Sequence, residues 1–152
     1  MKKSISIVAT LSLLVMLGCT QPVQEEVVDY TADKEALTKV MDDYIVEMLA
    51  GNVDAAVDGY QVDGICIMPQ GAIEGHEALR EFFTDFFENN QYTKYDYTIE
   101  DIKVGGDLAV IRMSISITIT PKDGSDPVNM DTQIAVVYDR QIDGSWKGAF
   151  AI

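Results

Sequence analysis

A strict alternation of apolar and polar residues runs through the second half of the chain. Isoleucine or methionine occupies every second position from Ile111 to Ile119, and arginine, serine or threonine stands between them. A period of two residues indicates a β-strand with one buried face and one polar face. Val128–Asp139 and Trp146–Ile152 predict further strands. A chain with this pattern must cover one broad apolar face of a sheet.

Two amphipathic helices are predicted upstream and can provide that cover. Apolar residues in Asp33–Gly51 recur at positions i, i+3, i+4 and i+7, which places them on one helix face. Gly75–Asn90 repeats this spacing with one leucine and four phenylalanines. Val53–Tyr60 predicts a short helix and Gly64–Pro69 a first strand. We expect an α+β fold in which a curved antiparallel sheet wraps around N-terminal helices and leaves an apolar pocket.

The strand predicted to precede the alternating segment contains a change of phase. Apolar residues alternate up to Ile99, and those from Ile102 onward fall one residue out of step. A slip of one residue predicts a β-bulge near Glu100 and Asp101.

The N-terminus has the organisation of an export signal. Two lysines precede an apolar run, Ile5–Leu17, which is too short for a transmembrane helix of about 20 residues. The run ends at Gly18-Cys19, and this junction resembles a bacterial lipobox. The resemblance implies that Cys19 becomes the lipidated N-terminus. Thr20 after the cysteine, in place of aspartate, is typical of outer-membrane sorting in lipoproteins.

Three segments follow from this interpretation: a signal peptide (1–18), a lipidated cysteine with a polar tether (19–32), and one domain (33–152). Two or three acyl chains, at about 0.8 kcal/mol for each buried CH₂, would hold the protein in the bacterial envelope. An ordinary secretory signal is the alternative.

The chain is strongly acidic, with a formal net charge of −14. Loss of the signal peptide with its two lysines leaves about −16. Phosphates would be repelled, so we expect no nucleic-acid partner. We also expect no basic patch for anionic headgroups, so membrane contact would come through the lipid anchor only.

Few residues have the chemistry of a catalytic group. Tyr44, on the inner face of the first helix, and Tyr60 could each donate a hydrogen bond to a ligand oxygen, or simply be core residues. Asp63 could either cap a turn or reach a substrate. Asp131 and Gln133 share one strand face; they are pocket residues if this face is concave and solvated if it is convex.

Metal and cofactor sites are not expected. His76 is the single histidine and is predicted to lie at the surface, and Cys66 sits in an apolar run as an inert hydrophobe. One histidine and one remaining cysteine make a zinc site improbable. No phosphate-binding loop or dinucleotide fingerprint occurs.

The order of the elements resembles the SnoaL-like and ketosteroid-isomerase-like branch of the nuclear transport factor 2-like superfamily. The resemblance covers residues 33–152 and is carried by Tyr44–Asp54, Tyr60, Asp63, Pro69 and Gly75–Phe83. It implies a cone-shaped fold with an apolar pocket.

The resemblance also implies that an isomerase base is missing. It places Tyr44 at the position of the catalytic tyrosine, whereas the residue before Pro69, where these isomerases hold a proton-abstracting aspartate, is Met68. Asp131 lies near the position of a second acid. A general base contributes about 10²–10⁴-fold to such catalysis, so isomerase activity is not expected.

Three functions remain open at this stage. The first is a binding protein for a small apolar molecule, the second an enzyme that uses Tyr44 with Asp63 or Asp131, and the third an interaction module that forms a homodimer through the outer sheet face. The expected ligand contacts are Tyr44, Met48, Tyr60, Met68, Phe83 and Gln133.

Overall fold

The structure is a computed structural model that describes residues 28–152. The predicted signal peptide, Cys19 and most of the tether lie outside the described residues. The elements are α1 (Thr31–Ala50), α2 (Val53–Asp58), β1 (Tyr60–Met68), β2 (Gly71–Glu74), α3 (Gly75–Asn89), β3 (Asn90–Gly105), β4 (Leu108–Pro121), β5 (Val128–Arg140) and β6 (Trp146–Ala151).

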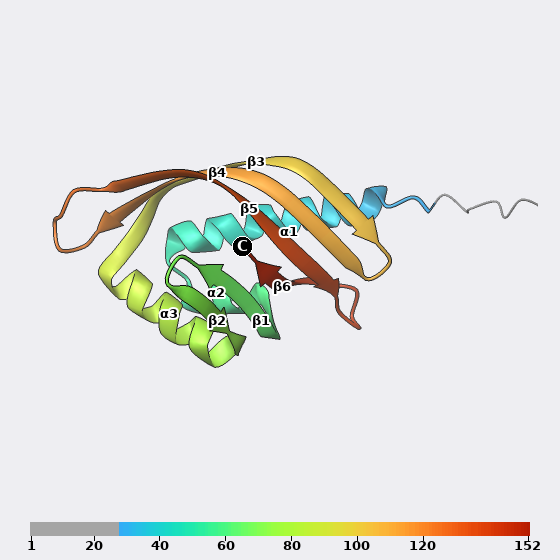
Figure 1. The fold of residues 1–152 in the computed structure, drawn as a ribbon, viewed down its shortest axis with the longest axis horizontal. Coiled ribbons are helices and arrows are strands. Elements are labelled where there is room, and N and C mark those ends of the chain that lie inside the picture. Colours follow the sequence, from blue (N-terminus) through green and yellow to red (C-terminus); the bar gives the residue numbers. More distant parts are fainter. Residues whose placement is uncertain (1–27) are drawn as a thin grey trace, which may run out of the picture.

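One six-stranded sheet, in the order β2-β1-β6-β5-β4-β3, organises the domain. All neighbouring strands are antiparallel except β1 and β6, which run parallel. The sheet curves around the helices, which lie on its concave side, and this confirms the expected α+β cone (Figure 1). The convex side carries no helix among the described elements (Figure 1).

The predicted bulge is present. The register between β3 and β4 shifts between Ile99 and Asp101, so the apolar residues on both sides of the shift face the helices. A bulge bends a strand and increases its local twist. This irregularity allows the long β3–β4 pair to wrap the core.

The core lies between the helices and the concave sheet face. Leu37 of α1, Leu79 of α3 and Ile111 of β4 are completely buried, and Phe83 is 4% exposed. The residues that alternate with the buried positions of β4 point to the convex side, as the period of two requires.

Two boundaries differ from the sequence prediction. β1 begins at Tyr60, not at Gly64, because Tyr60 pairs with Gly148 of β6 before a shift in register. α1 begins at Thr31, with the Asp29 carboxylate accepting from the Thr31 amide at 2.9 Å. These contacts are long-range or depend on a residue outside the helix, so the helical period did not reveal them.

His76 also departs from the prediction of a surface position. It is half-buried, and its Nε2 lies 2.9 Å from the carbonyl oxygen of Tyr60. The imidazole joins the start of α3 to the start of β1, which indicates a structural role.

Candidate functional site

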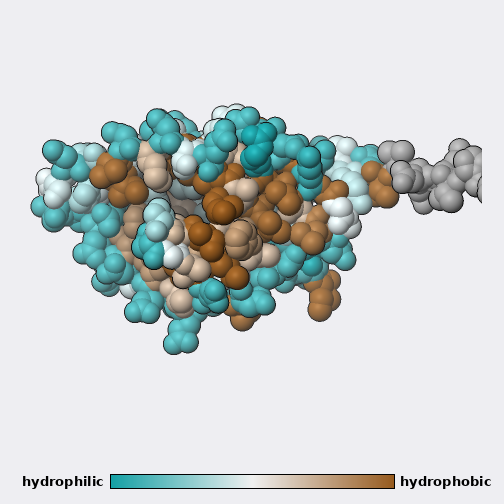
Figure 2. Space-filling view, in the orientation of Figure 1, coloured by the Kyte–Doolittle hydropathy of each residue, from teal (hydrophilic) through white to brown (hydrophobic). Residues whose placement is uncertain are grey.

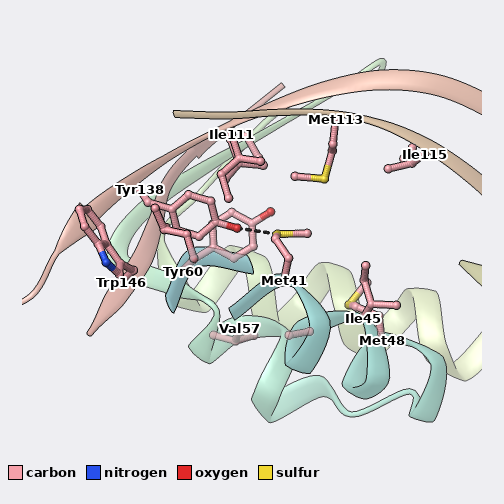
Figure 3. Close-up of a cluster of buried hydrophobic side chains, with 14 of the residues drawn as sticks. Met41, Ile45, Met48, Val57, Tyr60, Ile111, Met113, Ile115, Tyr138 and Trp146 are labelled. Carbon is pink, nitrogen blue, oxygen red and sulfur yellow. Dashed lines mark hydrogen bonds between the residues drawn. The ribbon is translucent and has the colours of Figure 1, made fainter. Parts of the chain in front are cut away.

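Tyrosines from four elements meet in the interior of the cone. They are Tyr44 of α1, Tyr60 of β1, Tyr92 and Tyr95 of β3, and Tyr138 of β5. Figure 3 shows Tyr60 and Tyr138 in the same buried cluster, with the Tyr138 hydroxyl directed at the sulfur of Met41. A phenol is a hydrogen-bond donor on an apolar ring, so this group forms an apolar surface that carries several hydrogen-bond donors.

Tyr44 is placed by the packing between α1 and the chain that enters β1. A Cβ atom on Gly59 would lie 2.8 Å from Cε2 of the Tyr44 ring, so the ring fits only because residue 59 is glycine. Burial, followed by the proximity of Tyr95, raises the pKa of Tyr44 well above its ordinary value. The Tyr44 hydroxyl is therefore a neutral donor at every physiological pH.

The Tyr60 hydroxyl lies near the Cys66 thiol. Burial raises the pKa of both groups, and the hydrogen bond from Tyr60 lowers that of Cys66 only in part. A thiol with a raised pKa is a poor nucleophile, since the thiolate is the reactive form. Cys66 thus adds a polarisable apolar atom to the interior.

Tyr138 completes the deeper part of the group. Its hydroxyl donates to the sulfur of Met41 at 2.8 Å, and burial raises its pKa. Thioether sulfur is a weak acceptor. A ligand oxygen would be a stronger acceptor for this donor than its present partner.

Tyr92 and Tyr95 form the outer part, next to the phenylalanines of α3. The ring centroids of Tyr92 and Phe86 are 4.9 Å apart, and those of Tyr92 and Tyr95 are 5.3 Å apart. Burial raises the pKa of Tyr95 to about 12. Among residues 28–152, only Trp146 Nε1 is a buried side-chain polar atom without a partner.

The interior opens where β5 extends beyond β6. Main-chain pairing to the C-terminal segment reaches only Ala135 of β5. Beyond it, Met130 and Val128 face the concave side opposite Ile117 and Ile119, and remain 43% and 57% exposed. Figure 2 shows a recess with apolar residues around it on this side of the molecule. We call this opening the mouth.

No ionised side chain lies in the interior of the described domain. The buried residues include no Lys, Arg, His, Asp or Glu. Tyr97, which follows the tyrosine group on β3, donates to the Asp42 carboxylate at 2.6 Å, and this carboxylate lies on the exposed flank of α1. An apolar interior without charge favours a neutral occupant.

The residues predicted for the site divide between two faces of the sheet. Tyr44, Met48, Tyr60 and Phe83 point into the core or the tyrosine group, and Met68 is half-buried at the end of β1.

Asp63, Asp131 and Gln133 are exposed, and the last two lie on the convex side. The convex alternative is therefore the correct one for Asp131, and placing Gln133 in the pocket was wrong. The reason is the pleat of β5, which turns Ile134 inward and its neighbours outward.

Sequence reasoning missed Tyr92, Tyr95 and Tyr138 as members of the group. The signal was present, because Tyr95 alternates with polar residues in phase with the apolar face of its strand. Asp131 and Gln133 instead border a shallow hollow of about 410 Å³ on the convex face.

No cluster of three or more His, Cys, Asp or Glu side chains within residues 28–152 has the geometry of a metal site. No helix in the same range is both long and apolar enough to span a bilayer.

Comparison with known proteins defines the family. The model of the SnoaL-like domain family matches residues 41–148, and the chain belongs to this family. A search of the curated proteins found no match.

Solved structures share the fold. A ketosteroid isomerase-like protein from Erwinia carotovora atroseptica has a TM-score of 0.72 and 20% identity, covering 80% of this chain and 94% of its own. A nuclear transport factor 2-like superfamily protein from Salmonella enterica has a TM-score of 0.71 and 16% identity, covering 81% and 90%. A protein from Catenulispora acidiphila in complex with S-DNPA has a TM-score of 0.68 and 17% identity, covering 80% and 91%.

Proposed function

We propose that the domain binds a neutral, mostly apolar small molecule that carries a hydrogen-bond acceptor, and performs no isomerase chemistry. The observation that carries the proposal is the tyrosine group: several neutral phenols around an interior without a charged side chain, next to an apolar mouth. Pockets of this composition suit ligands held by apolar contact and oriented by a few hydrogen bonds. The Catenulispora neighbour, which was solved in complex with S-DNPA, supports the use of this fold for binding.

The enzyme alternative requires a carboxylate at the site. Asp63 and Asp131 are exposed, and Met68 stands where the isomerases hold their base. A general base must come within about 2.6–3.2 Å of the proton that it removes, or reach it through one water. The positions of these residues argue against a role for Tyr44 with either aspartate.

The second part of the proposal is a lipid anchor at Cys19, which would place the domain at the bacterial envelope, on the outer membrane. Its support is the basic start, the apolar run and the Gly18-Cys19 junction. Mass spectrometry of the N-terminal peptide tests it, since a diacylated Cys19 is expected and an unmodified Cys19 would contradict it.

A homodimer is a further candidate, favoured by the convex sheet face. Ile65, Phe150, Val137 and Val110 lie directly opposite one another on four neighbouring strands, so they form an apolar row on this face. Figure 2 shows apolar surface over β5 and β6. Sedimentation should show a dimer that Val137→Lys dissociates, and a monomeric wild-type chain would contradict this.

The binding proposal is tested with two probes of equal size. The mature chain with Cys19→Ser, which has no acyl chains to compete, is titrated calorimetrically with 2-acetylnaphthalene and with 2-naphthoate. The ketone is expected to bind at least about tenfold more tightly, because the carboxylate would be buried without a cation. Tyr44→Phe should weaken ketone binding about three- to tenfold, the value of one hydrogen bond. Equal affinities for the two probes, or an unchanged ketone affinity in Tyr44→Phe, would contradict the proposal.

A further inference from the structure

Three segments that are distant in sequence meet at the end of the domain where the described chain begins. The Tyr30 hydroxyl accepts from the Gly106 amide of the β3–β4 turn at 3.1 Å. The Arg140 amide donates to the carbonyl oxygen of Asp107 in the same turn at 2.8 Å, and Arg140 leads directly into the β5–β6 turn. In Figure 1 this end lies at the right, where α1 begins. We call it the tether end.

Arg140 fixes the tether end. Its guanidinium pairs with Asp33 of α1 at 2.7 Å and with Asp107 at 3.4 Å, and its Cζ lies 4.3 Å from the centroid of the Trp146 ring. The β5–β6 turn is closed by a main-chain bond from Gln141 to Ser145 at 2.7 Å. The two turns are therefore held in a defined position relative to α1.

Each of the three segments presents an exposed aliphatic side chain. Val28 is 56% exposed, Leu108 51%, and Ile142, in the β5–β6 turn, is fully exposed. Ile142 lies within a turn, where polar residues or glycine are usual, and Leu108 directly follows one. The β4–β5 loop at the opposite end follows this rule within the loop itself, with residues 122–126 all polar or glycine, and its exposed apolar residues, Val128 and Met130, belong to the mouth.

The chain outside the described residues determines what lies nearest to this end. Eight residues separate Cys19 from Val28, and an extended chain of that length reaches about 30 Å at most. A lipidated Cys19 would keep the tether end within that distance of the bilayer. We infer that the tether end rests on the membrane, with Ile142, Leu108 and Val28 inserted among the lipid headgroups and upper acyl chains. This inference depends on the proposed lipid anchor.

The charges around Val28, Leu108 and Ile142 indicate which kind of lipid headgroup the tether end would contact. Asp29, Asp107 and Asp143 are exposed, and Lys34 and Lys103 are the exposed cations near them in the chain. This balance offers no cationic patch for anionic headgroups. The contact is therefore apolar, suits zwitterionic lipid, and is insensitive to salt.

This orientation determines from which side a ligand enters. α1 starts at the tether end and is 20 residues long, or about 30 Å, and its later turns carry Tyr44 toward the mouth. The mouth then opens away from the bilayer. A ligand would enter from the aqueous compartment and not from the lipid phase.

The test uses the full lipidated chain in vesicles of phosphatidylcholine and phosphatidylethanolamine. Cys66→Ala removes the remaining thiol, and an environment-sensitive nitrobenzoxadiazole label is attached at Ile142→Cys. The matched control carries the same label at Ser125→Cys in the β4–β5 loop. We expect the label at 142 to emit at shorter wavelength and to lose about half of its emission to nitroxide-bearing lipids, in low and in high salt. The label at 125 should behave as in water.

Mass spectrometry of Cys19 on the same sample separates the two proposals. A lipidated Cys19 with water-like emission at both positions would contradict the inference that the tether end rests on the membrane, and would leave the proposed lipid anchor intact. Equal quenching at 142 and 125 would overturn the orientation. An unmodified Cys19 would overturn the anchor, and the inference with it.

Discussion

The two ends of the cone are built from the same strands but differ in how they are closed. At the tether end, β6 lies beside β5, Trp146 is 3% exposed, and Arg140 ties α1 to two turns. At the mouth, β5 continues without β6, and Met130 and Val128 face the concave side with about half of their surface exposed. One end is thus fastened by packing and charge, and the other leaves apolar surface open.

The comparison shows that coverage by neighbouring strands, more than residue type, decides whether an inward-facing residue becomes part of the core or part of a binding site. The inward positions of β4 are isoleucine or methionine along most of its length, yet Ile111 is fully buried while Ile119 is only half-buried. Exposed apolar surface that a fold does not cover is typical of binding sites. We therefore expect substitutions at the closed end to affect stability and those at the mouth to affect binding.

The largest expected effect contrasts Trp146→Ala with Met130→Ala. Removal of the buried indole should cost about 3–5 kcal/mol of unfolding free energy, whereas truncation of the exposed Met130 should cost less than about 0.5 kcal/mol. Urea denaturation measures both. Similar losses for the two variants would remove the distinction between the ends.

The second-largest expected effect is a loss of folding stability at alkaline pH, caused by the buried tyrosines. Burial raises the pKa of Tyr95 from 10.0 to about 12, so above pH 10 the unfolded chain loses a proton that the folded chain retains. Stability should be constant below pH 10 and fall as pH rises from 10 to 12, by about 2 kcal/mol for this residue. Denaturation at pH 9, 10 and 11 measures the slope. Tyr95→Phe should make the slope smaller by the contribution of this residue, while Tyr44, Tyr60 and Tyr138, whose pKa values are also raised, keep the rest. An equal slope in that variant would contradict the assignment.

Arg140→Gln should have a smaller effect, at the tether end. It removes the half-buried pairing with Asp33 and the stacking on Trp146, which together contribute about 1–2 kcal/mol. The matched control is Arg112→Gln, an exposed arginine on the convex face. Thermal unfolding should separate the two variants, and indistinguishable curves would show that Arg140 does not fasten this end.

Asp131→Asn is expected to have the smallest effect. The carboxylate is exposed on the convex face, so both stability and probe binding should change by less than about 0.5 kcal/mol. Calorimetry with 2-acetylnaphthalene checks this. A large loss of binding would return Asp131 to the site and reopen the enzyme alternative.

Periodicity in the sequence predicted most of the helices and strands of the fold. The spacing of Leu79 and Phe83 placed α3, the alternation around Met113 placed β4, and the phase change after Ile99 placed the bulge. These are local patterns, in which each residue's face follows from its neighbours. The parallel pairing of β1 with β6 joins segments about 90 residues apart, and no local pattern contains it.

The site was only partly predictable from the sequence. Tyr44 and Tyr60 were identified because they lie on apolar faces of their own elements. The side of the sheet that Gln133 occupies depends on which face of β5 meets the helices, which is a tertiary property. The role of Val128 and Met130 depends on where β6 stops, and that too is set by tertiary contacts.

A ligand of this domain must reach the tyrosine-lined interior through the mouth. The chain's own methionines can report on it, in a ¹³C-methyl spectrum recorded before and after addition of 2-acetylnaphthalene. Met130 at the mouth and Met41 beside Tyr138 should both shift with the same saturation curve. A spectrum in which Met41 does not move at saturating probe would contradict the claim.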